Sequence, residues 1–395
     1  MAEASALLET CAPSRECVRA RSKLTGMYLI VGRYRELLDR SEVDLAMARD
    51  FGVEEEEVRS LQFRGAARTQ LGDPAGLDDL RGAYAKGLEL SLGEETAVAC
   101  GNLAFETWVW VGPAAALELW TRNVVFCEAR GLVPMAATSR SGQLETLFDL
   151  GRWDEVLRVA DEIQRQGRGL GEDEGDSLID LQADLYRAWV LRRRGRTAEA
   201  VAAAEGTLPR ARRAGYPEML AQALLVAAMA ARLRGDEGAC RRYVEEFARE
   251  TEEHVDSRVL YLPIAVRAMI AGGDIDLAES MLVPDDAVTA PRHRYPLLSA
   301  RAAVAEARGR HAGAAEGYEE AASRWAELEC PLEEGLALAG LARCRLALGR
   351  ADEARAPLEE ARARLVALKA DPDVEDTDRV LASIEAAART VVDPA

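Results

Sequence analysis

The fold is decided by residues 332–368, which read LEEGLALAGLARCRLALGRADEARAPLEEARARLVAL. Apolar residues recur every three or four positions before Leu348, and again from Ala354 to Leu368, which indicates two amphipathic helices. Gly349 stands between them and supplies the backbone freedom that a sharp reversal needs. Asp352 and Glu353 follow in the first turn of the second helix, where the helix dipole favours negative charge. The stretch therefore predicts a helix–turn–helix hairpin.

The same turn recurs along the whole chain. It is marked by nine glycines, spaced 36 to 44 residues apart with a mean of about 40: Gly32, Gly72, Gly112, Gly151, Gly195, Gly235, Gly273, Gly309 and Gly349. So regular a period predicts consecutive hairpins packed side by side. We expect an all-α solenoid of about nine repeats, in which each repeat contacts only its neighbours.

The repeats suggest a division of the chain into five parts. Residues 1–13 form a lead, 14–166 an amino-terminal half, 167–176 a loop, 177–370 a carboxyl-terminal half, and 371–395 a capping helix with a tail. The loop is rich in glycine and acids and is the longest interruption, so any hinge is expected there. It lacks the ordered ligands of a calcium-binding loop, and we expect it to be solvated.

The composition argues against several classes of partner. The chain has a net charge of −18 and an isoelectric point of about 4.9, which disfavours nonspecific binding to nucleic acid or to an anionic membrane. Its seven cysteines are scattered and form no C-x-x-C pair, as expected of free, mostly buried thiols in a reducing cytoplasm. No signal peptide and no apolar run long enough for a membrane span is recognisable. We expect a cytoplasmic protein, whose oligomeric state the sequence does not indicate.

Aligning the repeats on the turn glycine exposes columns of small residues. Seven residues before it stand Gly65, Ala188, Ala228, Ala302 and Ala342, and five after it Ala200, Cys240, Ala278, Ala314 and Ala354. Bulky residues such as Tyr318 and Leu358 stand nine after it. This pattern resembles the tetratricopeptide repeat (TPR) over nearly the whole chain. The period departs from the usual 34 residues, and the proline that closes the second helix is mostly missing.

The resemblance implies a right-handed α-solenoid that binds a partner. In its alanine- and arginine-rich composition, the array is also similar to the TPR arrays of bacterial signalling ATPases and LuxR-type regulators. The sequence contains no phosphate-binding loop, no nucleophile elbow and no metalloprotease motif. Its three histidines have no second ligand at metal-binding spacing. We therefore expect no cofactor and no metal.

The resemblance also implies where a ligand binds. The first helix of each pair lines the concave face, at positions ten, six and three residues before the turn glycine. The residues expected in this groove are Asn102, Glu106, Ser141, Glu145, Trp189, Arg192, Arg232, Arg267 and Arg343. Since arginine binds carboxylates with two parallel hydrogen bonds, the four arginines suggest an acidic peptide or a small anion. Equally, these arginines could pair with acids inside the array.

Three functions are compatible with these features. The first is a non-catalytic scaffold or regulatory module that binds a protein or peptide segment in its groove, with no direct contact to nucleic acid or membrane. The second is a sensor module of a signalling ATPase or transcription activator, with a small effector in the groove. The third is an enzyme whose site is built across several repeats. A deep enclosed pocket favours the second or third, and an open groove favours the first.

Overall fold

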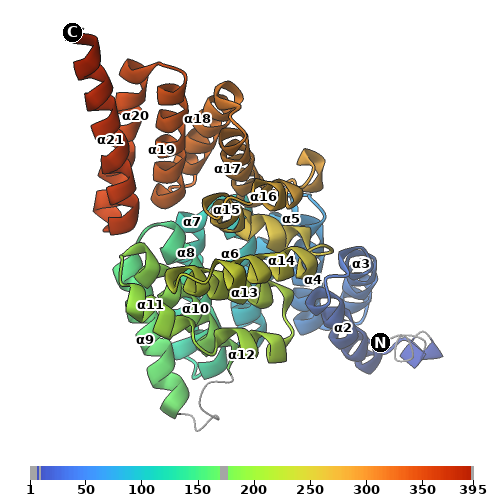
Figure 1. Ribbon diagram of the computed structural model, residues 1–395. Helices are drawn as coiled ribbons and strands as arrows, with labels where there is room; N and C mark the ends of the chain where they lie inside the picture. The colour runs from blue at the N-terminus through green and yellow to red at the C-terminus, as the bar shows by residue number, and fades with distance from the viewer. Residues whose placement is uncertain (1–6, 9, 170–176, 393–395) are drawn as a thin grey trace. The chain divides into compact units, whose positions relative to one another are not determined.

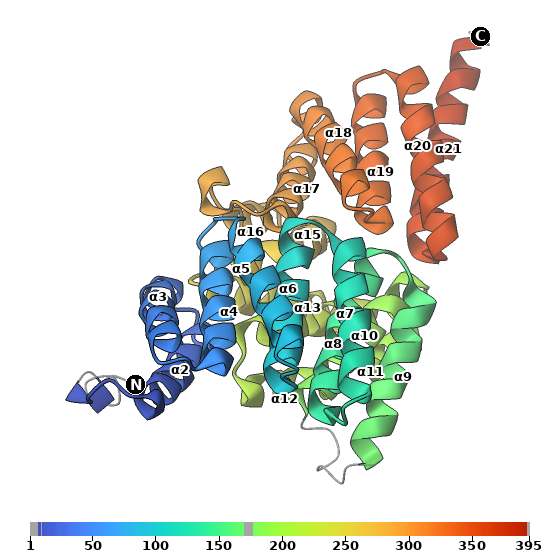
Figure 2. The same ribbon diagram turned by 180° about the vertical axis from the view of Figure 1, so that it is seen from behind.

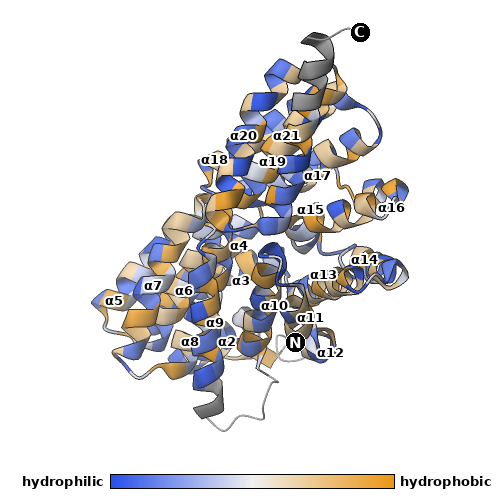
Figure 3. Cartoon of the chain, turned by 60° about the vertical axis from the view of Figure 1, so that its left-hand side comes forward, coloured by the Kyte–Doolittle hydropathy of each residue, from blue (hydrophilic) through white to orange (hydrophobic). Residues whose placement is uncertain are grey.

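The computed structural model describes residues 7–8, 10–169 and 177–392, and in these ranges every regular element is a helix. The chain divides into two compact units, Met1–Gly142 and Gln143–Ala395, which we describe separately. Figures 1 and 2 show the paired helices along the chain, and Figure 3 shows polar and apolar residues alternating around them. This alternation is expected of helices that bury one face.

In the first unit, successive helices pack as antiparallel neighbours. They are α2 (Arg15–Ile30), α3 (Tyr34–Asp50), α4 (Glu54–Gln70), α5 (Gly76–Glu89), α6 (Glu94–Trp110), α7 (Pro113–Glu128) and the first part of α8 (Val133–Asp149). Helices α4 and α5 cross closely: a Cβ added to Gly65 would lie 2.7 Å from the carbonyl oxygen of Gly76, and one added to Gly76 would lie 2.3 Å from that of Gly65. Glycine is therefore required at the crossing.

The second unit continues the same pattern from the end of α8. Its helices are α9 (Trp153–Gly169), α10 (Leu178–Arg193), α11 (Thr197–Ala204), α12 (Thr207–Ala214), α13 (Pro217–Leu233), α14 (Glu237–Glu250), α15 (Val255–Ala271), α16 (Ile275–Ser280), α17 (Pro291–Ala307), α18 (His311–Glu327), α19 (Pro331–Ala347), α20 (Ala351–Leu368) and α21 (Asp371–Val392). A short 3₁₀ turn, η1 (Asp285–Ala287), precedes α17.

The predicted reversals are confirmed at all nine turn glycines. Each has a positive φ, from 68° at Gly195 to 135° at Gly112. The return turns between repeats use the same backbone region. Gly52 and Gly131 occupy it in two of them, but Ser91, Glu329 and Lys369 do so at a φ of 56° without being glycine.

Three expectations about local structure need correction: from the apolar periodicity and the positions of proline, the sequence predicts one helix over 197–214, a loop over 283–292 and a loop over 167–176. Residues 197–214, predicted as one helix, form α11 and α12, because Gly206 takes a φ of 78° between them. Helix α17 begins at Pro291, inside the segment expected to be a loop, so Arg292 is helical. Helix α9 runs to Gly169, into the loop expected at 167–176.

Part of the predicted organisation lies outside the described residues. This applies to residues 170–176 of the loop, to residues 1–6 and 9 of the lead, and to the tail at 393–395. The hinge expected at 167–176 and the division into two halves there remain predictions. The capping helix is present as α21, which packs on α20.

The second unit differs from a simple solenoid, because its last repeats contact its first. The carboxylate of Asp149 at the end of α8 pairs with Arg292 of α17, with both nitrogen–oxygen distances 3.1 Å. Arg193 of α10 pairs with Asp373 of α21 at 3.0 Å. The turn at Gly151 packs so closely on Leu368 that an added Cβ would lie 2.2 Å from the leucine Cδ2. The unit therefore closes on itself, in addition to its neighbour-to-neighbour packing (Figures 1 and 2).

All seven cysteines are free thiols, as expected, and only Cys11 is exposed. None of the described helices combines the length and the apolar character needed to span a bilayer.

Candidate ligand-binding groove and inner pocket

The closed second unit contains two neighbouring cavities. The larger, which we call the groove, has a volume of about 410 Å³. It is lined by residues from six helices: Arg193, Arg267, Ile270, Ala271, Ser299, Ala303, Glu306, Ala307, Tyr318, Glu333, Leu336, Ala337, Arg343, Asp373 and Asp376. Most come from first helices of their pairs, namely α10, α15, α17 and α19. The first helices therefore line the groove, as the TPR resemblance implies.

Three guanidinium groups in the groove are each bound to a carboxylate. Arg267 contacts Glu333 at 2.8 and 3.0 Å, and Arg343 contacts Glu306 at 2.6 and 2.9 Å, both with two hydrogen bonds. Arg193 binds Asp373 of the capping helix. Since Asp376 adds a fourth carboxylate, the groove holds no excess positive charge from its lining arginines.

Tyr318 forms the wall of the groove beside Arg343. Its hydroxyl donates to Glu306 at 2.7 Å, and its ring covers Gly340 so closely that a Cβ there would lie 2.4 Å from the ring. Burial, followed by the charge of Glu306, raises the pKa of Tyr318. The phenol is therefore a permanent donor that holds Glu306 toward Arg343.

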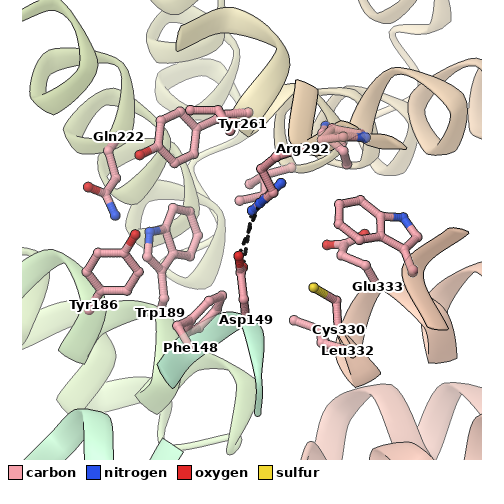
Figure 4. Close-up of a pocket in the computed structure, with 15 residues that line it drawn as sticks. Phe148, Asp149, Tyr186, Trp189, Gln222, Tyr261, Arg292, Cys330, Leu332 and Glu333 are labelled. Carbon is pink, nitrogen blue, oxygen red and sulfur yellow. Dashed lines mark hydrogen bonds and ion pairs between the residues drawn. The ribbon is translucent and has the colours of Figure 1, made fainter. Parts of the chain in front are cut away.

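The smaller cavity, which we call the inner pocket, is about 60 Å³ in volume and adjoins the groove at Glu333 (Figure 4). Aromatic and apolar side chains dominate its lining: Phe148, Tyr186, Trp189, Leu260, Tyr261, Pro263, Ile264, Pro296, Trp325, Cys330 and Leu332. The polar lining groups are Asp149, Gln222, Arg292 and Glu333. An apolar pocket with a few convergent polar groups is the usual form of a small-ligand site.

A network of acids and tyrosines surrounds the inner pocket. Glu145 is 9% exposed and accepts a hydrogen bond from Gln182 Nε2 at 2.9 Å. Burial, and then the charges of Glu218 and Asp149, raise its pKa well above the usual value for a glutamate. Burial also raises the pKa of Tyr186 and of Tyr261. Near neutral pH both phenols are protonated.

Arg292 is the buried cation of this network. Burial by itself would lower the pKa of its guanidinium, but the paired Asp149 outweighs that effect and raises it. The guanidinium also lies 5.3 Å from the ring centroid of Trp325, within the range of a cation–π contact. Arg292 is therefore charged, and its charge is balanced by Asp149.

The predicted groove residues fall in several places. Arg267 and Arg343 line the groove, and Trp189 lines the inner pocket. Glu145 lies in the acidic network just described. Arg232 donates to the carbonyl oxygen of Ala268 at 2.7 Å and to Glu237 at 2.9 Å.

The other predicted residues are arranged as follows. Arg192 precedes Arg193 at the end of α10, and no hydrogen bond or ion pair between described side chains uses its guanidinium. Asn102, Glu106 and Ser141 belong to the first unit, where Glu106 accepts from Gln70 Nε2 at 2.8 Å. Glu106 and Ser141 are buried and Asn102 is half-buried. A common ligand-binding role for these residues remains a prediction.

Several pocket residues were missed by reading only three positions per repeat. Gln222, Leu260, Pro296 and Leu336 all stand thirteen residues before their turn glycine, which is one helical turn before the first predicted column. Extending the predicted face by that turn would have found them. Arg292 was missed because its segment was expected to be a loop.

No protein-family model matches the chain, and neither does any curated protein. Solved structures do match. The apo form of the quorum sensor NprR from B. thuringiensis has a TM-score of 0.50 at 12% identity, covering 93% of this chain and 91% of that one. A Rap protein complexed with Competence and Sporulation Factor gives 0.49 at 14% identity, covering 94% and 98%. Yeast Tom70 gives 0.39 at 13%, covering 99% and 92%.

At 12% identity, the likeness to NprR concerns the fold alone. Together with the confirmed turn glycines and the paired helices, it establishes that this chain has a TPR-like helical-repeat fold.

Proposed function

We propose that the chain is a non-catalytic interaction module that holds a charged segment of a partner protein in the groove of its second unit. The groove has a volume of about 410 Å³, and most of its lining residues come from first helices of the repeats. Its polar groups are arginines and carboxylates on rigid helices, which suit the recognition of a charged chain segment.

The observation that carries the proposal is the guanidinium of Arg192, the residue that precedes the groove-lining Arg193 at the end of α10. Among the described side chains it has neighbouring charges but no hydrogen-bonded carboxylate. Burial, followed by the charge of Arg193, lowers its pKa, while Asp373 and Asp376 oppose the shift. Binding a ligand carboxylate stabilises a half-buried guanidinium that has no partner. The attraction between the two charges offsets the free energy that each group loses when it is removed from water.

Arg267 and Arg343 support the proposal because their ion pairs line the groove and remain in contact with water. Their side chains are 31% and 43% exposed, and Glu333 and Glu306 are 20% exposed. Both pairs are therefore accessible to the charged groups of a bound segment.

The proposal is tested by charge reversal at Arg343 in the groove and at Arg192 beside it. A partner is first identified by capture from native cell extract, and its bound segment is narrowed with overlapping synthetic peptides. The affinity of the best peptide is then measured for the wild type, for Arg192→Glu and for Arg343→Glu. We expect each variant to bind at least about tenfold more weakly, equivalent to about 1.4 kcal/mol, and the wild-type affinity to fall with added salt.

Arg81→Glu is the matched control, since Arg81 lies on an exposed surface of the first unit, paired with Asp78 at 2.7 Å. Helical content, measured by circular dichroism, should be the same in all variants. An affinity unchanged in both Arg192→Glu and Arg343→Glu would contradict the proposal.

A sensor of a small effector is the second candidate, and the inner pocket is the observation that favours it. The pocket is smaller than the groove, mostly apolar, and has polar groups directed into it.

A further inference from the structure

We propose that the inner pocket binds a neutral, flat aromatic group that carries a hydrogen-bond acceptor. This inference goes beyond the proposed function, which depends on the charges of the groove. It is based on the shape, polarity and charge of the inner pocket itself.

The walls of the inner pocket suit an aromatic ring. Tyr186, Trp189, Tyr261 and Trp325 are all at least nine-tenths buried and present ring surface to the cavity. Phe148 packs against Tyr186 with ring centroids 5.6 Å apart and planes tilted by 59°. Aromatic rings prefer such tilted or offset neighbours, so a further ring can join the cluster favourably.

Gln222 specifies the polar contact. Its side chain is 2% exposed and lines the pocket, yet its Nε2 has no hydrogen-bond partner among the described residues. In Figure 4 the Gln222 amide lies beside Tyr186. A buried donor without a partner is costly, and a ligand oxygen placed there removes the cost.

The charges around the pocket select a neutral ligand. Among the described residues, Arg292 is the only arginine or lysine that lines the inner pocket, and Asp149 already binds it with two hydrogen bonds. Glu333 is likewise bound to Arg267. An added carboxylate would therefore meet Asp149 and Glu333, and no lining cation that lacks a bound carboxylate.

Two prolines that line the inner pocket are independent evidence that it is a functional site. Pro263 in α15 and Pro296 in α17 stand inside helices, and both line the inner pocket. A proline in a helix interior removes one backbone hydrogen bond and is disfavoured. The first helices of two consecutive repeats thus each place a helix-disfavouring proline at the inner pocket. Residues that disfavour their own secondary structure are concentrated at functional sites.

The aromatic group can come from two sources. Because the inner pocket adjoins the groove at Glu333, a segment held in the groove could insert an aromatic side chain, with a backbone carbonyl as the acceptor. Alternatively, a free small aromatic molecule could enter. The chemistry of the site is the same in both cases.

The test compares small probes on the full chain. Benzamide presents an aromatic ring with a neutral acceptor, toluene lacks the acceptor, and benzoate carries a charge. Binding is followed by isothermal titration calorimetry and by the fluorescence of the pocket tryptophans. We expect benzamide to bind at least tenfold more tightly than either toluene or benzoate.

Two variants connect the binding to the pocket. Gln222→Met keeps the length of the side chain but removes the amide, so it should abolish the preference for benzamide over toluene and raise the melting temperature. Ile264→Phe should fill the cavity and remove binding of all three probes. Gln62→Met makes the same chemical change in the first unit and should leave every affinity unchanged.

The outcomes are decisive. Tight binding of N-acetyl-phenylalaninamide, with weaker binding of its alanine counterpart, would identify a partner side chain as the source, whereas binding of benzamide alone would identify a free molecule. If no probe binds, the proposal is wrong, and a lower melting temperature of Gln222→Met would then show that water satisfies the amide. Arg192→Glu should not alter probe binding, so this test is independent of the proposed function.

Discussion

At the scale of single residues, the second unit keeps ionisable groups where water is scarce. Glu145 accepts from Gln182, and its carboxyl is surrounded by Glu218, Asp149, Arg292 and Tyr186. Its raised pKa means that the folded protein holds this proton more tightly than the unfolded chain does. The resulting stabilisation is complete below the ordinary carboxyl pKa of about 4.3 and is lost as the pH rises through the raised value.

Glu145→Gln removes this dependence. We expect the variant to have nearly wild-type stability at pH 4 and to be more stable than wild type at pH 8, by on the order of 1 kcal/mol, because no carboxylate must then ionise in the buried network. Thermal unfolding at the two pH values measures the difference. Equal effects of the substitution at both pH values would show that Glu145 ionises normally.

At the scale of the element, the hairpins depend on residues in the left-handed backbone region. Gly309 takes a φ of 75° in a turn where an added Cβ would meet no atom within 4 Å. Any cost of alanine there arises from the backbone alone. Glu329 occupies the same region at 56° in a return turn, with an exposed side chain.

These two positions give opposite predictions. Gly309→Ala should lower the free energy of unfolding by about 1 kcal/mol, since the left-handed conformation disfavours a side chain. Glu329→Gly should raise it by about 0.5 kcal/mol, because relief of backbone strain exceeds the entropy that glycine adds to the unfolded chain. Urea denaturation of both variants measures the changes. A stabilising alanine at position 309 would contradict the positive φ.

At the scale of the whole molecule, ion pairs distant in sequence close the second unit. The pair between Asp149 and Arg292 is the more deeply buried of these long-range pairs. The side chain of Asp149 is 12% exposed and that of Arg292 is 10% exposed. Removing one partner leaves the other charged and buried, which typically costs about 3–5 kcal/mol.

Asp149→Asn should therefore destabilise the second unit by an amount in that range, and hydrogen exchange should quicken in α8 and in α17 together. Glu36→Gln is the control. It breaks an exposed pair with Arg33 whose side chains are 51% and 44% accessible, and it should change stability by less than about 0.5 kcal/mol. Faster exchange in α17 alone would mean that the pair does not couple the two helices.

The repeat architecture could be predicted because its signal is local. A turn glycine such as Gly349 acts within its own hairpin, so the sequence around it suffices. The site could be predicted only in part. Arg267 and Arg343 were found from their columns, but the partner of Arg267 is Glu333, 66 residues away. Closure of the second unit depends on contacts that no local sequence pattern encodes. The end of α11 was not predicted either, because Gly206 lies outside the repeat period of the turn glycines.

Closure also restricts how this chain can change over evolution. An open array tolerates the gain or loss of a hairpin, since only the ends move. Between Asp149 and Asp373, however, the number of hairpins sets the circumference that lets α21 reach α10. Inserting or deleting one repeat there would separate Asp373 from Arg193 and distort both cavities, so we expect variation in length to be confined to segments outside this arc.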